Sequence, residues 1–210
     1  MTEWLFVFAA YLVGSTPTSL WVGRAFHGVD LRREGSGNLG ATNAFRILGW
    51  RSALPVVVVD ILKGWAPVAL FPLLIGGVPN DGWLIAIGAA AVAGHVFSFW
   101  VGFRGGKGVA TSAGVFLALA PTALLVALVV WLAVVATSGY VSLGSILAAV
   151  ALPPAVMLTP HRGGGAVTLF ALGLAGFVIW AHRSNIRRLA RGEESRFRRR
   201  GADTRGAGHE

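Results

Sequence analysis

A polar, glycine-punctuated segment interrupts an otherwise apolar chain at residues 34–46, which read EGSGNLGATNAFR. Gly37 and Gly40 let the backbone turn through positive φ and present consecutive N–H groups to an anion. The segment adds neutral hydrogen-bonding side chains and one guanidinium, on Ser36, Asn38, Thr42, Asn43 and Arg46. Because a planar guanidinium matches the geometry of a phosphate, this composition predicts a phosphate site. An ordinary connecting loop is the alternative, since glycine, asparagine and serine are common turn formers.

A second glycine-rich segment, FRGGKGVATS at residues 103–112, encloses Lys107 between Gly106 and Gly108. It precedes an apolar run, so we expect it at the start of a helix, where free N–H groups and the helix dipole attract an anion. The segment is not a Walker A loop, because Val101 and Gly108 occupy the positions that require glycine and Ser or Thr. Lys107 is therefore a candidate phosphate ligand without ATP binding. A basic residue flanking a membrane span is the alternative.

A third polar group follows the last apolar run, where His182, Asn185 and Arg188 are spaced three residues apart. Residues at this spacing lie on one side of a helix, so His182 and Asn185 are predicted to share a face. A histidine that merely lies at the membrane boundary is the alternative for His182.

Ionisable residues also interrupt the apolar runs themselves, at Asp60, Lys63 and His95. A charge inside a membrane helix costs about 2.5 to 3.5 kcal/mol on insertion scales and usually pairs with another charge or lines a cavity. Asp60 and Lys63 are therefore expected to pair or to line a functional cavity. For His95, a hydrogen bond between helices is an equal alternative.

Several familiar catalytic arrangements are absent from the sequence. It contains no cysteine, no His-x-x-x-x-Asp motif, no His-Glu-x-x-His zinc motif and no Gly-x-Ser-x-Gly nucleophile elbow. The sequence also contains no cluster of carboxylates and histidines that would indicate a metal site. The remaining candidate is a site rich in cations and amides, suited to phosphate beside an acyl chain and lacking an obvious strong base.

The composition indicates an integral membrane protein. Hydrophobic residues make up 55% of the chain and charged residues 13%, and the mean hydropathy is +0.68. The net charge of +9 does not indicate nucleic acid, because nine arginines lie in the last thirty residues, directly after an apolar run. That position is typical of a cytoplasmic flank.

Apolar runs long enough for a bilayer of roughly 30 Å predict the membrane helices. They lie at residues 4–23, 53–75, 83–101, 109–136, 143–158 and 166–181. The run 109–136 is long for one span, and Pro121 lies near its middle. If Pro121 divides it into two short crossings, the arginine-rich end joins the other cationic loops and only Arg162 lies outside, as the positive-inside rule favours.

The sequence therefore predicts an all-α polytopic integral membrane protein with seven transmembrane helices, two of them short and split near Pro121. The N-terminus is expected outside and the C-terminus in the cytoplasm. Under this topology four polar segments, residues 34–46, 103–112, 137–145 and 182–194, converge at the cytoplasmic face. We expect them to form a single site.

The motifs together resemble the bacterial acyl-phosphate:glycerol-3-phosphate acyltransferases, the PlsY family. Three stretches carry the resemblance: SGN with GATN and Arg46 at residues 36–46, GGKGVAT at 105–111, and HR, NI, RL, Gly192 and Glu194 at 182–194. Weaker matches are Gly14-Ser15, Asp60 with Lys63-Gly64, Gly94-His95, and Tyr140-Val141-Ser142 with Ser145. The resemblance covers nearly the whole chain, to about residue 196.

This resemblance implies an enzyme that transfers a fatty acyl group from acyl phosphate to the sn-1 hydroxyl of glycerol 3-phosphate. The products are lysophosphatidic acid and inorganic phosphate, in the first step of phospholipid synthesis. It implies direct transfer without a covalent acyl-enzyme, no cofactor and no metal, and membrane lipids rather than nucleic acid as partners. The implied location is the bacterial cytoplasmic (inner) membrane, with the active site at the cytoplasmic face.

The resemblance also implies roles for individual residues. The expected catalytic set is Lys107, Ser36, Arg46, His182 and Asn185. Expected substrate and phosphate contacts are Gly37, Asn38, Gly40, Thr42, Asn43, Gly105, Gly106, Gly108, Thr111, Ser142, Ser145, Arg188 and Glu194. Glu194 is expected to position Arg188 or His182, and the sequence does not choose between Ser142 and Ser145 as a phosphate donor.

The chain departs from the family pattern at Ser98, where a proline is expected after the Gly-His pair. Residues 1–196 are expected to form one transmembrane acyltransferase domain, and residues 197–210 a basic, disordered tail.

Two alternatives belong to other classes of protein. A small organic-phosphate transporter would show inverted repeats and a site at the middle of the membrane. A structural membrane protein would need none of these polar segments.

Overall fold

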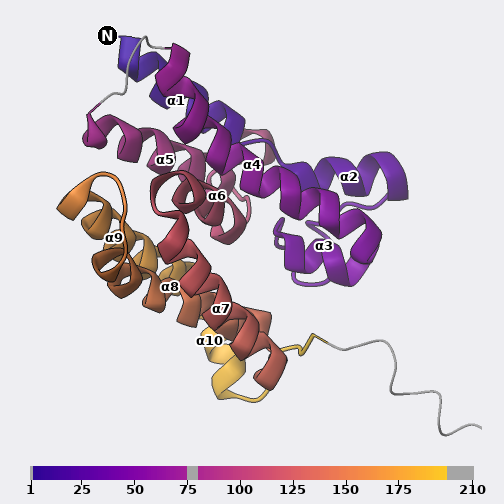
Figure 1. The fold of residues 1–210 in the computed structure, drawn as a ribbon. Helices are drawn as coiled ribbons and strands as arrows, with labels where there is room; N and C mark the ends of the chain where they lie inside the picture. The colour runs from indigo at the N-terminus through magenta and orange to yellow at the C-terminus, as the bar shows by residue number, and fades with distance from the viewer. Residues whose placement is uncertain (1, 75–79, 198–210) are drawn as a thin grey trace, which may run out of the picture.

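The computed structural model describes residues 2–74 and 80–197, and these parts are helical without any strand (Figure 1). The predicted tail at 197–210 lies outside the described residues except for Phe197. In chain order the helices are α1 (Thr2–Gly14), α2 (Thr18–His27), α3 (Ala41–Leu48), α4 (Trp50–Leu74), α5 (Asp81–Val96), the 3-10 turn η1 (Phe99–Val101), α6 (Val109–Leu119), α7 (Pro121–Ser138), α8 (Val141–Leu158), α9 (Gly164–Ala181) and α10 (Arg183–Ala190).

Six helical stretches in the described residues are long and apolar enough to cross a membrane, and α6 is a shorter apolar helix. The prediction of an all-helical membrane protein with seven such segments is therefore confirmed. The division at Pro121 is also confirmed, because Ala120 leaves the helical conformation with φ −150° and Pro121 begins α7. A proline is well suited to this first helical position, since it has no N–H to donate. With 18 residues α7 is long enough to cross on its own, so α6 is the short member of the pair.

The first expected span, residues 4–23, is interrupted in the structure. Helix α1 ends at Gly14, and α2 begins at Thr18 and leaves at an angle (Figure 1). Pro17 explains the break, because it lacks an N–H and disfavours a helical conformation of Thr16. The carbonyl oxygen of Thr16 is thereby free to accept a hydrogen bond from Lys63 Nζ on α4 at 2.8 Å.

Glycines allow two pairs of helices to approach at backbone distance. A Cβ on Gly64 of α4 would lie 2.0 Å from the carbonyl oxygen of Thr111, and a Cβ on Gly114 of α6 would lie 1.9 Å from that of Ile61. Helices α1 and α5 approach in the same way, because Gly14 of α1 lies against the backbone of α5 and Gly94 of α5 lies against the backbone of α1. Close contact through small residues is the usual basis of helix association in a membrane, where the hydrophobic effect gives little drive.

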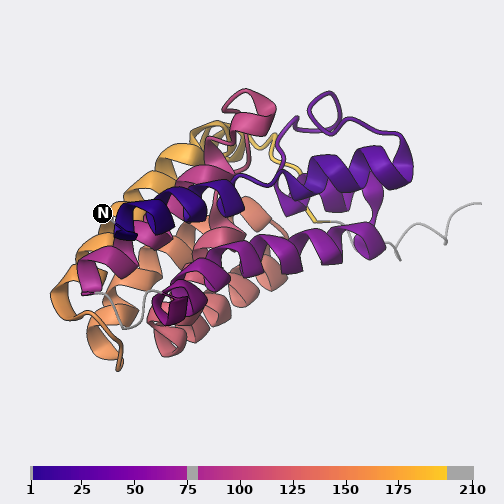
Figure 2. The same cartoon turned by 90° about the horizontal axis from the view of Figure 1, so that it is seen from above.

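Helix α4 joins the two parts of the fold. It runs the length of the molecule and packs against α1, α5 and α6 in the bundle and against α2 and α3 at its other end (Figures 1 and 2). A separate apolar cluster around Leu31, Ala44, Val56 and Val101 fixes α2, α3 and their connection to this end. The polar segment 34–46 is therefore packed against the helix bundle.

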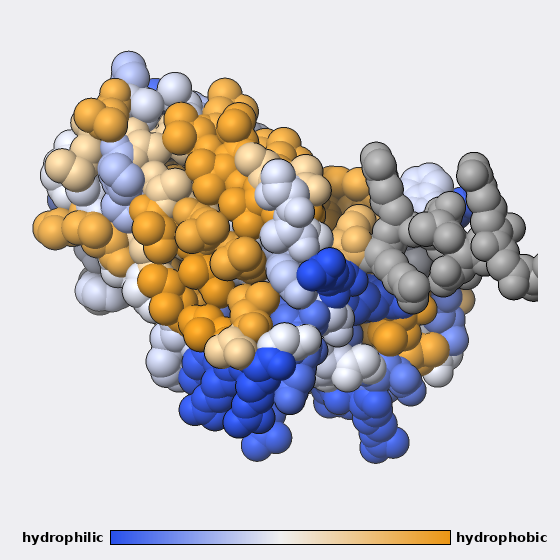
Figure 3. Space-filling view, turned by 90° about the horizontal axis from the view of Figure 1, so that it is seen from below, coloured by the Kyte–Doolittle hydropathy of each residue, from blue (hydrophilic) through white to orange (hydrophobic). Residues whose placement is uncertain are grey.

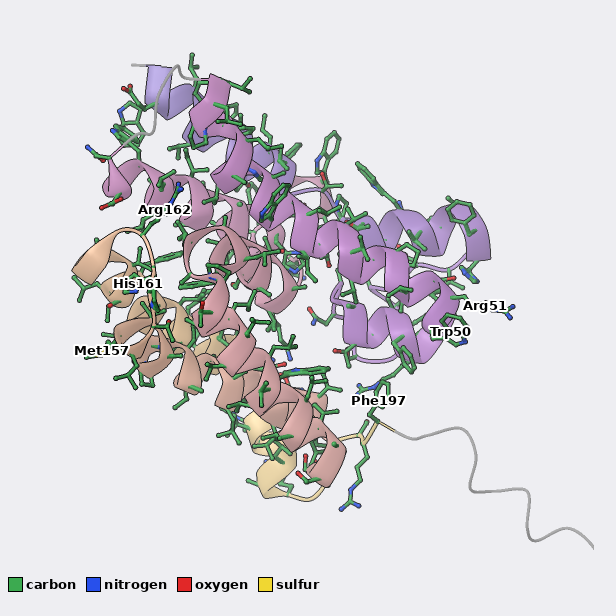
Figure 4. The ribbon with its side chains drawn as sticks, in the orientation of Figure 1. Trp50, Arg51, Met157, His161, Arg162 and Phe197 are labelled. Carbon is green, nitrogen blue, oxygen red and sulfur yellow. The ribbon has the colours of Figure 1, made fainter. Side chains whose placement is uncertain are left out.

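The outer surface has the distribution expected for a protein in a bilayer. Large apolar side chains such as Leu73, Val129 and Leu158 are mostly exposed. Figure 3 shows a broad hydrophobic area on one face, with hydrophilic residues gathered at its edge. Arg162 and His161 lie at one end of the molecule, and Trp50, Arg51 and Phe197 lie at the other (Figure 4). Arg162 is thus separated from the cations of the polar segments, as the sequence predicts.

The crossing of α4 and α6 gives a first testable prediction. Gly64→Ala and Gly114→Ala should each lower the free energy of unfolding by about 1 to 3 kcal/mol, because the added methyl meets a carbonyl oxygen. Thermal unfolding in detergent micelles measures this loss. Gly173→Ala and Gly176→Ala on α9 are matched controls, since nothing lies within 4 Å of either Cβ. Equal stability of the two sets of variants would contradict the close approach.

Candidate functional site: a phosphate site beside an apolar cavity

Two cavities meet at the end of the molecule where the polar segments converge. The larger has a volume of about 630 Å³ and extends between α4, α6, α7 and α8. The smaller, of about 390 Å³, is lined by the cationic residues Arg104, Arg183 and Arg187 and by apolar side chains such as Phe97 and Trp180. Both cavities are lined by Ser36, Asn38, Lys107 and Ser184.

The larger cavity changes character along its length. Apolar side chains from four helices form most of its wall, among them Leu54, Phe116, Leu128 and Leu152. Its polar end brings together residues that are far apart in the chain: Ser36, Asn38, Gly40, Thr42, Asn43, Arg46, Lys107, Gly108, Ser142, Ser145, His182, Asn185, Arg188 and Glu194. Such a cavity is suited to a ligand with an acyl chain and an anionic head.

Asn43 organises the first polar segment. Its Oδ1 accepts a hydrogen bond from the backbone N–H of Ser36 at 3.0 Å, and its Nδ2 donates to the carbonyl oxygens of Leu31 and Glu34. Gly35 and Gly37 have φ of 59° and 69°, the left-handed conformation that favours glycine. The buried Asn43 amide thus holds the turn that carries Ser36 and Asn38 to the cavities.

The second polar segment is fixed by its backbone. The N–H groups of Gly105 and Gly106 donate to the carbonyl oxygens of Val96 and His95 at 2.8 and 3.2 Å. Gly108, with φ of 80°, then turns the chain into α6. This loop places Lys107 between the two cavities, where its Nζ donates a hydrogen bond to Oδ1 of Asn185.

Ser98 shows that the departure from the family pattern does not disturb this region. Its φ of −67° is a value that a proline also adopts, and α5 ends two residues earlier. The buried Ser98 hydroxyl donates to the carbonyl oxygen of Ser15 at the break between α1 and α2.

Glu194 is the hydrogen-bonding centre of the polar end. Its Oε1 accepts from Ser142 Oγ at 2.7 Å and from Asn185 Nδ2 at 2.6 Å, and its Oε2 accepts from Arg188 Nε at 2.6 Å. Burial raises the pKa of Glu194, but these three hydrogen bonds outweigh it and hold the pKa below its ordinary value. Glu194 is therefore an ionised carboxylate that orients Asn185 and Arg188.

Lys107 has a lowered pKa, of about 8. Burial is the largest cause and the charge of Arg188 is the next, while Glu194 acts in the opposite direction. Arg46 and Arg183 lower the pKa further. An anion binding among these cations would relieve their repulsion, so the site favours a phosphate electrostatically.

His182 is neutral in this environment. Burial and the charge of Lys107 lower its pKa to about 4. Its Nδ1 lies 2.8 Å from the carbonyl oxygen of Val178, and since a carbonyl only accepts, Nδ1 carries the proton. Nε2 is then left as a hydrogen-bond acceptor on a residue that lines the larger cavity.

The two candidate serines on α8 have different partners. Ser142 Oγ donates to Glu194, whereas Ser145 Oγ donates to the carbonyl oxygen of Val141 and accepts from Trp131 Nε1. Both line the larger cavity. Ser142 is thus part of the Glu194 network, and Ser145 belongs to the wall formed by α7 and α8.

Thr111 and Ser112 show where the sequence pattern and the structure differ. The expected contact residue Thr111 is fully buried against Gly64 and lines neither cavity. Its neighbour Ser112 lines the larger cavity, and Ser112 Oγ has no hydrogen-bond partner among the described residues. Helical phase separates the two, and Ser112 was not predicted, because the helix orientation is not visible in the motif. Ser184 was missed for the same reason.

The segment after α10 closes the polar end from one side. Arg46 donates to the carbonyl oxygen of Ser195 at 3.2 Å, the backbone N–H of Phe197 donates to that of Gly139 at 2.6 Å, and the rings of Phe45 and Phe197 are 4.6 Å apart. Phe197 also lines the larger cavity (Figure 4). No sequence signal indicated that this segment would join α3 to the α7–α8 turn.

Within residues 2–74 and 80–197, no group of three or more histidine, aspartate or glutamate side chains gathers as metal ligands would. The residues that converge are instead cations, amides and hydroxyls around one carboxylate. The fold and this site define the chain as an integral membrane protein with a cationic, amide-rich site beside an apolar cavity.

Comparison with known proteins identifies the family. The profile of the glycerol-3-phosphate acyltransferase family matches residues 4–192. The glycerol-3-phosphate acyltransferase of Listeria monocytogenes serovar 1/2a is 46% identical over 189 residues, covering 90% of this chain and 93% of that protein. The enzyme of Geobacter sulfurreducens is 46% identical over 198 residues, covering 94% and 99%. The chain therefore belongs to the glycerol-3-phosphate acyltransferase family.

Solved structures have the same fold. A crystal structure of PlsY (YgiH), an integral membrane glycerol 3-phosphate acyltransferase, in its glycerol 3-phosphate form, superposes with a TM-score of 0.84 at 38% identity. It covers 94% of this chain and 96% of that one. The lysophosphatidic acid form gives a TM-score of 0.83 at 34% identity. The resemblance to PlsY drawn from the motifs is confirmed.

The pKa of Lys107 can be tested directly, because the whole sequence contains only two lysines, Lys63 and Lys107. Only the neutral amine reacts with an amine-reactive ester, so labelling of Lys107 should rise as the pH increases through about 8. Mass spectrometry of the labelled peptide over a pH series measures the midpoint, with Lys107→Arg as the control. A midpoint near the ordinary lysine value of about 10.4 would show that Lys107 is not held among cations.

Proposed function

We propose that this chain transfers a fatty acyl group from acyl phosphate to the sn-1 hydroxyl of glycerol 3-phosphate. The observation that carries this proposal is the position of Lys107, between an apolar cavity that fits an acyl chain and a cationic one that fits a soluble phosphate. Membership of the glycerol-3-phosphate acyltransferase family supports the acceptor. The absence of a nucleophile motif in the sequence favours a donor that is already activated.

The proposed chemistry is direct transfer. The sn-1 hydroxyl oxygen attacks the acyl carbonyl carbon, and the bond from that carbon to the phosphate oxygen breaks. The hydroxyl proton leaves with the phosphate, so the products are lysophosphatidic acid and inorganic phosphate. Acyl phosphate is a mixed anhydride with a good leaving group, so positioning and charge stabilisation supply most of the catalysis. The low pKa of His182 agrees with this, because a residue with a pKa of about 4 accepts a hydrogen bond but is a weak base.

In this proposal each group has a distinct part. Lys107 and the N–H groups at the start of α6 bind the donor phosphate and stabilise negative charge on the acyl oxygen. Ser36, Thr42 and Arg46 bind phosphate or glycerol hydroxyls from the α3 side. His182 and Asn185 orient glycerol 3-phosphate, and Glu194 keeps Asn185 and Arg188 in place.

We further propose that the site faces the cytoplasm of a bacterial inner membrane. The polar segments 34–46, 103–112 and 182–194 hold seven of the eighteen lysines and arginines, whereas Arg162 lies at the opposite end (Figure 4). Cytoplasmic loops carry the excess of positive charge. A transporter is less well supported, because most of the polar groups that line the two cavities lie at one end of the helices.

A donor comparison tests the proposed reaction. Purified chain with labelled glycerol 3-phosphate should form lysophosphatidic acid from palmitoyl phosphate and not from palmitoyl-CoA or palmitoyl-acyl carrier protein. Lys107→Met should lower kcat/KM at least about 100-fold, since removal of one charge-stabilising donor has this effect. Arg191→Met is the matched control, an exposed cation on the same face that lines neither cavity. Product from the thioester donors alone would exclude acyl phosphate, and an acylated serine would exclude direct transfer.

The orientation can be tested with single cysteines, because the sequence has none. In intact cells, Arg162→Cys should react with a membrane-impermeant maleimide, whereas Arg191→Cys should react only after permeabilisation. Retained activity of both variants shows that they are folded. Labelling of Arg191→Cys in intact cells would place the site on the outer face.

A further inference from the structure

Three buried ionisable residues have no part in the proposed chemistry. Asp60, Lys63 and His95 are exposed by only 1%, 5% and 6%. Asp60 and Lys63 lie on α4 and His95 lies on α5, where it contacts the loop that carries Lys107. Asp60 and His95 also line the larger cavity. Buried charges are costly in a membrane helix, so their presence requires a reason.

Asp60 and Lys63 form an ion pair that also ties α4 to the break in the first span. Lys63 Nζ lies 2.7 Å from Asp60 Oδ1 and donates to the carbonyl oxygen of Thr16 at 2.8 Å. Thr18 Oγ1 donates to the same carboxylate oxygen at 3.2 Å. The carboxylate is thereby fixed from both α4 and α2.

His95 links this ion pair to the loop. One edge of its ring faces the carboxylate, with Nδ1 3.8 Å from Asp60 Oδ1. The other edge lies against the loop, because a Cβ built on Gly106 would be 2.1 Å from Nε2, 2.8 Å from Cε1 and 3.1 Å from Cδ2. The carbonyl oxygen of His95 also accepts the N–H of Gly106 at 3.2 Å.

A buried ion pair gains little over well-packed apolar residues, since desolvation offsets the attraction, and its best-attested use is to specify one arrangement among several. Gly106 is the loop residue that the His95 ring contacts. Lys107 follows Gly106 directly, so a movement of Gly106 moves the lysine between the two cavities.

We propose that His95 is a positioning residue whose ring, oriented by the Asp60–Lys63 pair, supports Gly106 and so directs Lys107 to the reacting phosphate. The inference rests on the proposed function, because it assigns the ring an effect on acyl transfer. It adds to the site a buried layer of ionisable residues, of which Asp60 and His95 also line the larger cavity.

The contact between the His95 ring and Gly106 can be tested by enlarging one residue and shortening the other. Gly106→Ala adds a methyl group, and the three heavy atoms nearest to it all belong to the His95 side chain. His95→Asn removes the ring tip and keeps a polar group toward Asp60. Each single variant should lower kcat about 10- to 100-fold, since a misplacement of about 1 Å costs up to 100-fold. Together they should restore kcat to within about tenfold of the original chain, because the methyl fills the space of the ring tip.

Gly105→Ala is the matched control. A Cβ there would meet the backbone carbonyl oxygens of His95 and Val96 at 1.9 and 2.9 Å, which no side-chain change at residue 95 can relieve. His95→Asn should therefore not rescue Gly105→Ala. Thermal unfolding in detergent accompanies every variant, and His95→Ala with Gly106→Ala replaces the first pair if His95→Asn does not fold.

The ion pair is tested separately by removing both charges together. Asp60→Asn with Lys63→Met should lower kcat by about the same factor as His95→Asn, and adding His95→Asn should lower it little further, since residues that act through one contact are not additive. Additive losses in this set would contradict an action through the ring.

The outcomes separate this inference from the proposed function. If the unaltered chain forms lysophosphatidic acid only from another donor, acyl phosphate is excluded and the exchange is measured with that donor. If the chain is active and the exchanged pair is no better than either single variant, His95 does not support Gly106. A rise in KM for glycerol 3-phosphate with unchanged kcat would instead show that His95 binds substrate directly, and would also overturn the proposal.

Discussion

The structure depends on one buried carboxylate that holds cations and amides in place at the boundary between an apolar cavity and water. Glu194 accepts hydrogen bonds from Ser142, Asn185 and Arg188, and Asn185 in turn accepts one from Lys107. Without that negative charge, Lys107 and the arginines around it would repel one another in a site shielded from water. The carboxylate does not neutralise them all, so the site retains the positive charge that a phosphate would meet.

The helix bundle supplies the rigid frame on which this network acts. Glycine crossings bring α4 against α6 and α1 against α5 at backbone distance, which fixes the ends of α5 and α6 on either side of the loop 103–108. The loop then needs few contacts of its own: two backbone hydrogen bonds to α5, and the ring of His95 beneath it. A flexible cation is in this way held on short, packed segments, which limits the ordering required when a substrate binds.

The two cavities explain why so polar a site lies at the end of an apolar bundle. In the proposed reaction a lipid-soluble donor and a water-soluble acceptor have to meet without either entering the other's medium. The larger cavity is walled by side chains of α4, α6, α7 and α8, and the smaller by arginines, loop backbone and apolar side chains such as Phe97 and Trp180. Lys107 lines both cavities. The electrostatic and apolar halves of the proposed reaction thus meet at Lys107, and Ser36, Asn38 and Ser184 also line both cavities.

The sequence by itself determined the class of protein, the helices and the motifs, because long apolar runs, Pro121 and glycine-rich polar segments act locally. It also indicated that Lys107, Arg46 and His182 would belong to one site, since charge bias places their segments on one side of a membrane. The sequence could not decide which face of a helix reaches the cavity, so it selected Thr111 where Ser112 lines the wall. The sequence also could not show that the break before Pro17 leaves the carbonyl oxygen of Thr16 to accept a hydrogen bond from Lys63. Nor could it show that Phe197 packs on Phe45. Those features arise from contacts between residues distant in the chain, whose geometry depends on how the helices cross and not on any local pattern.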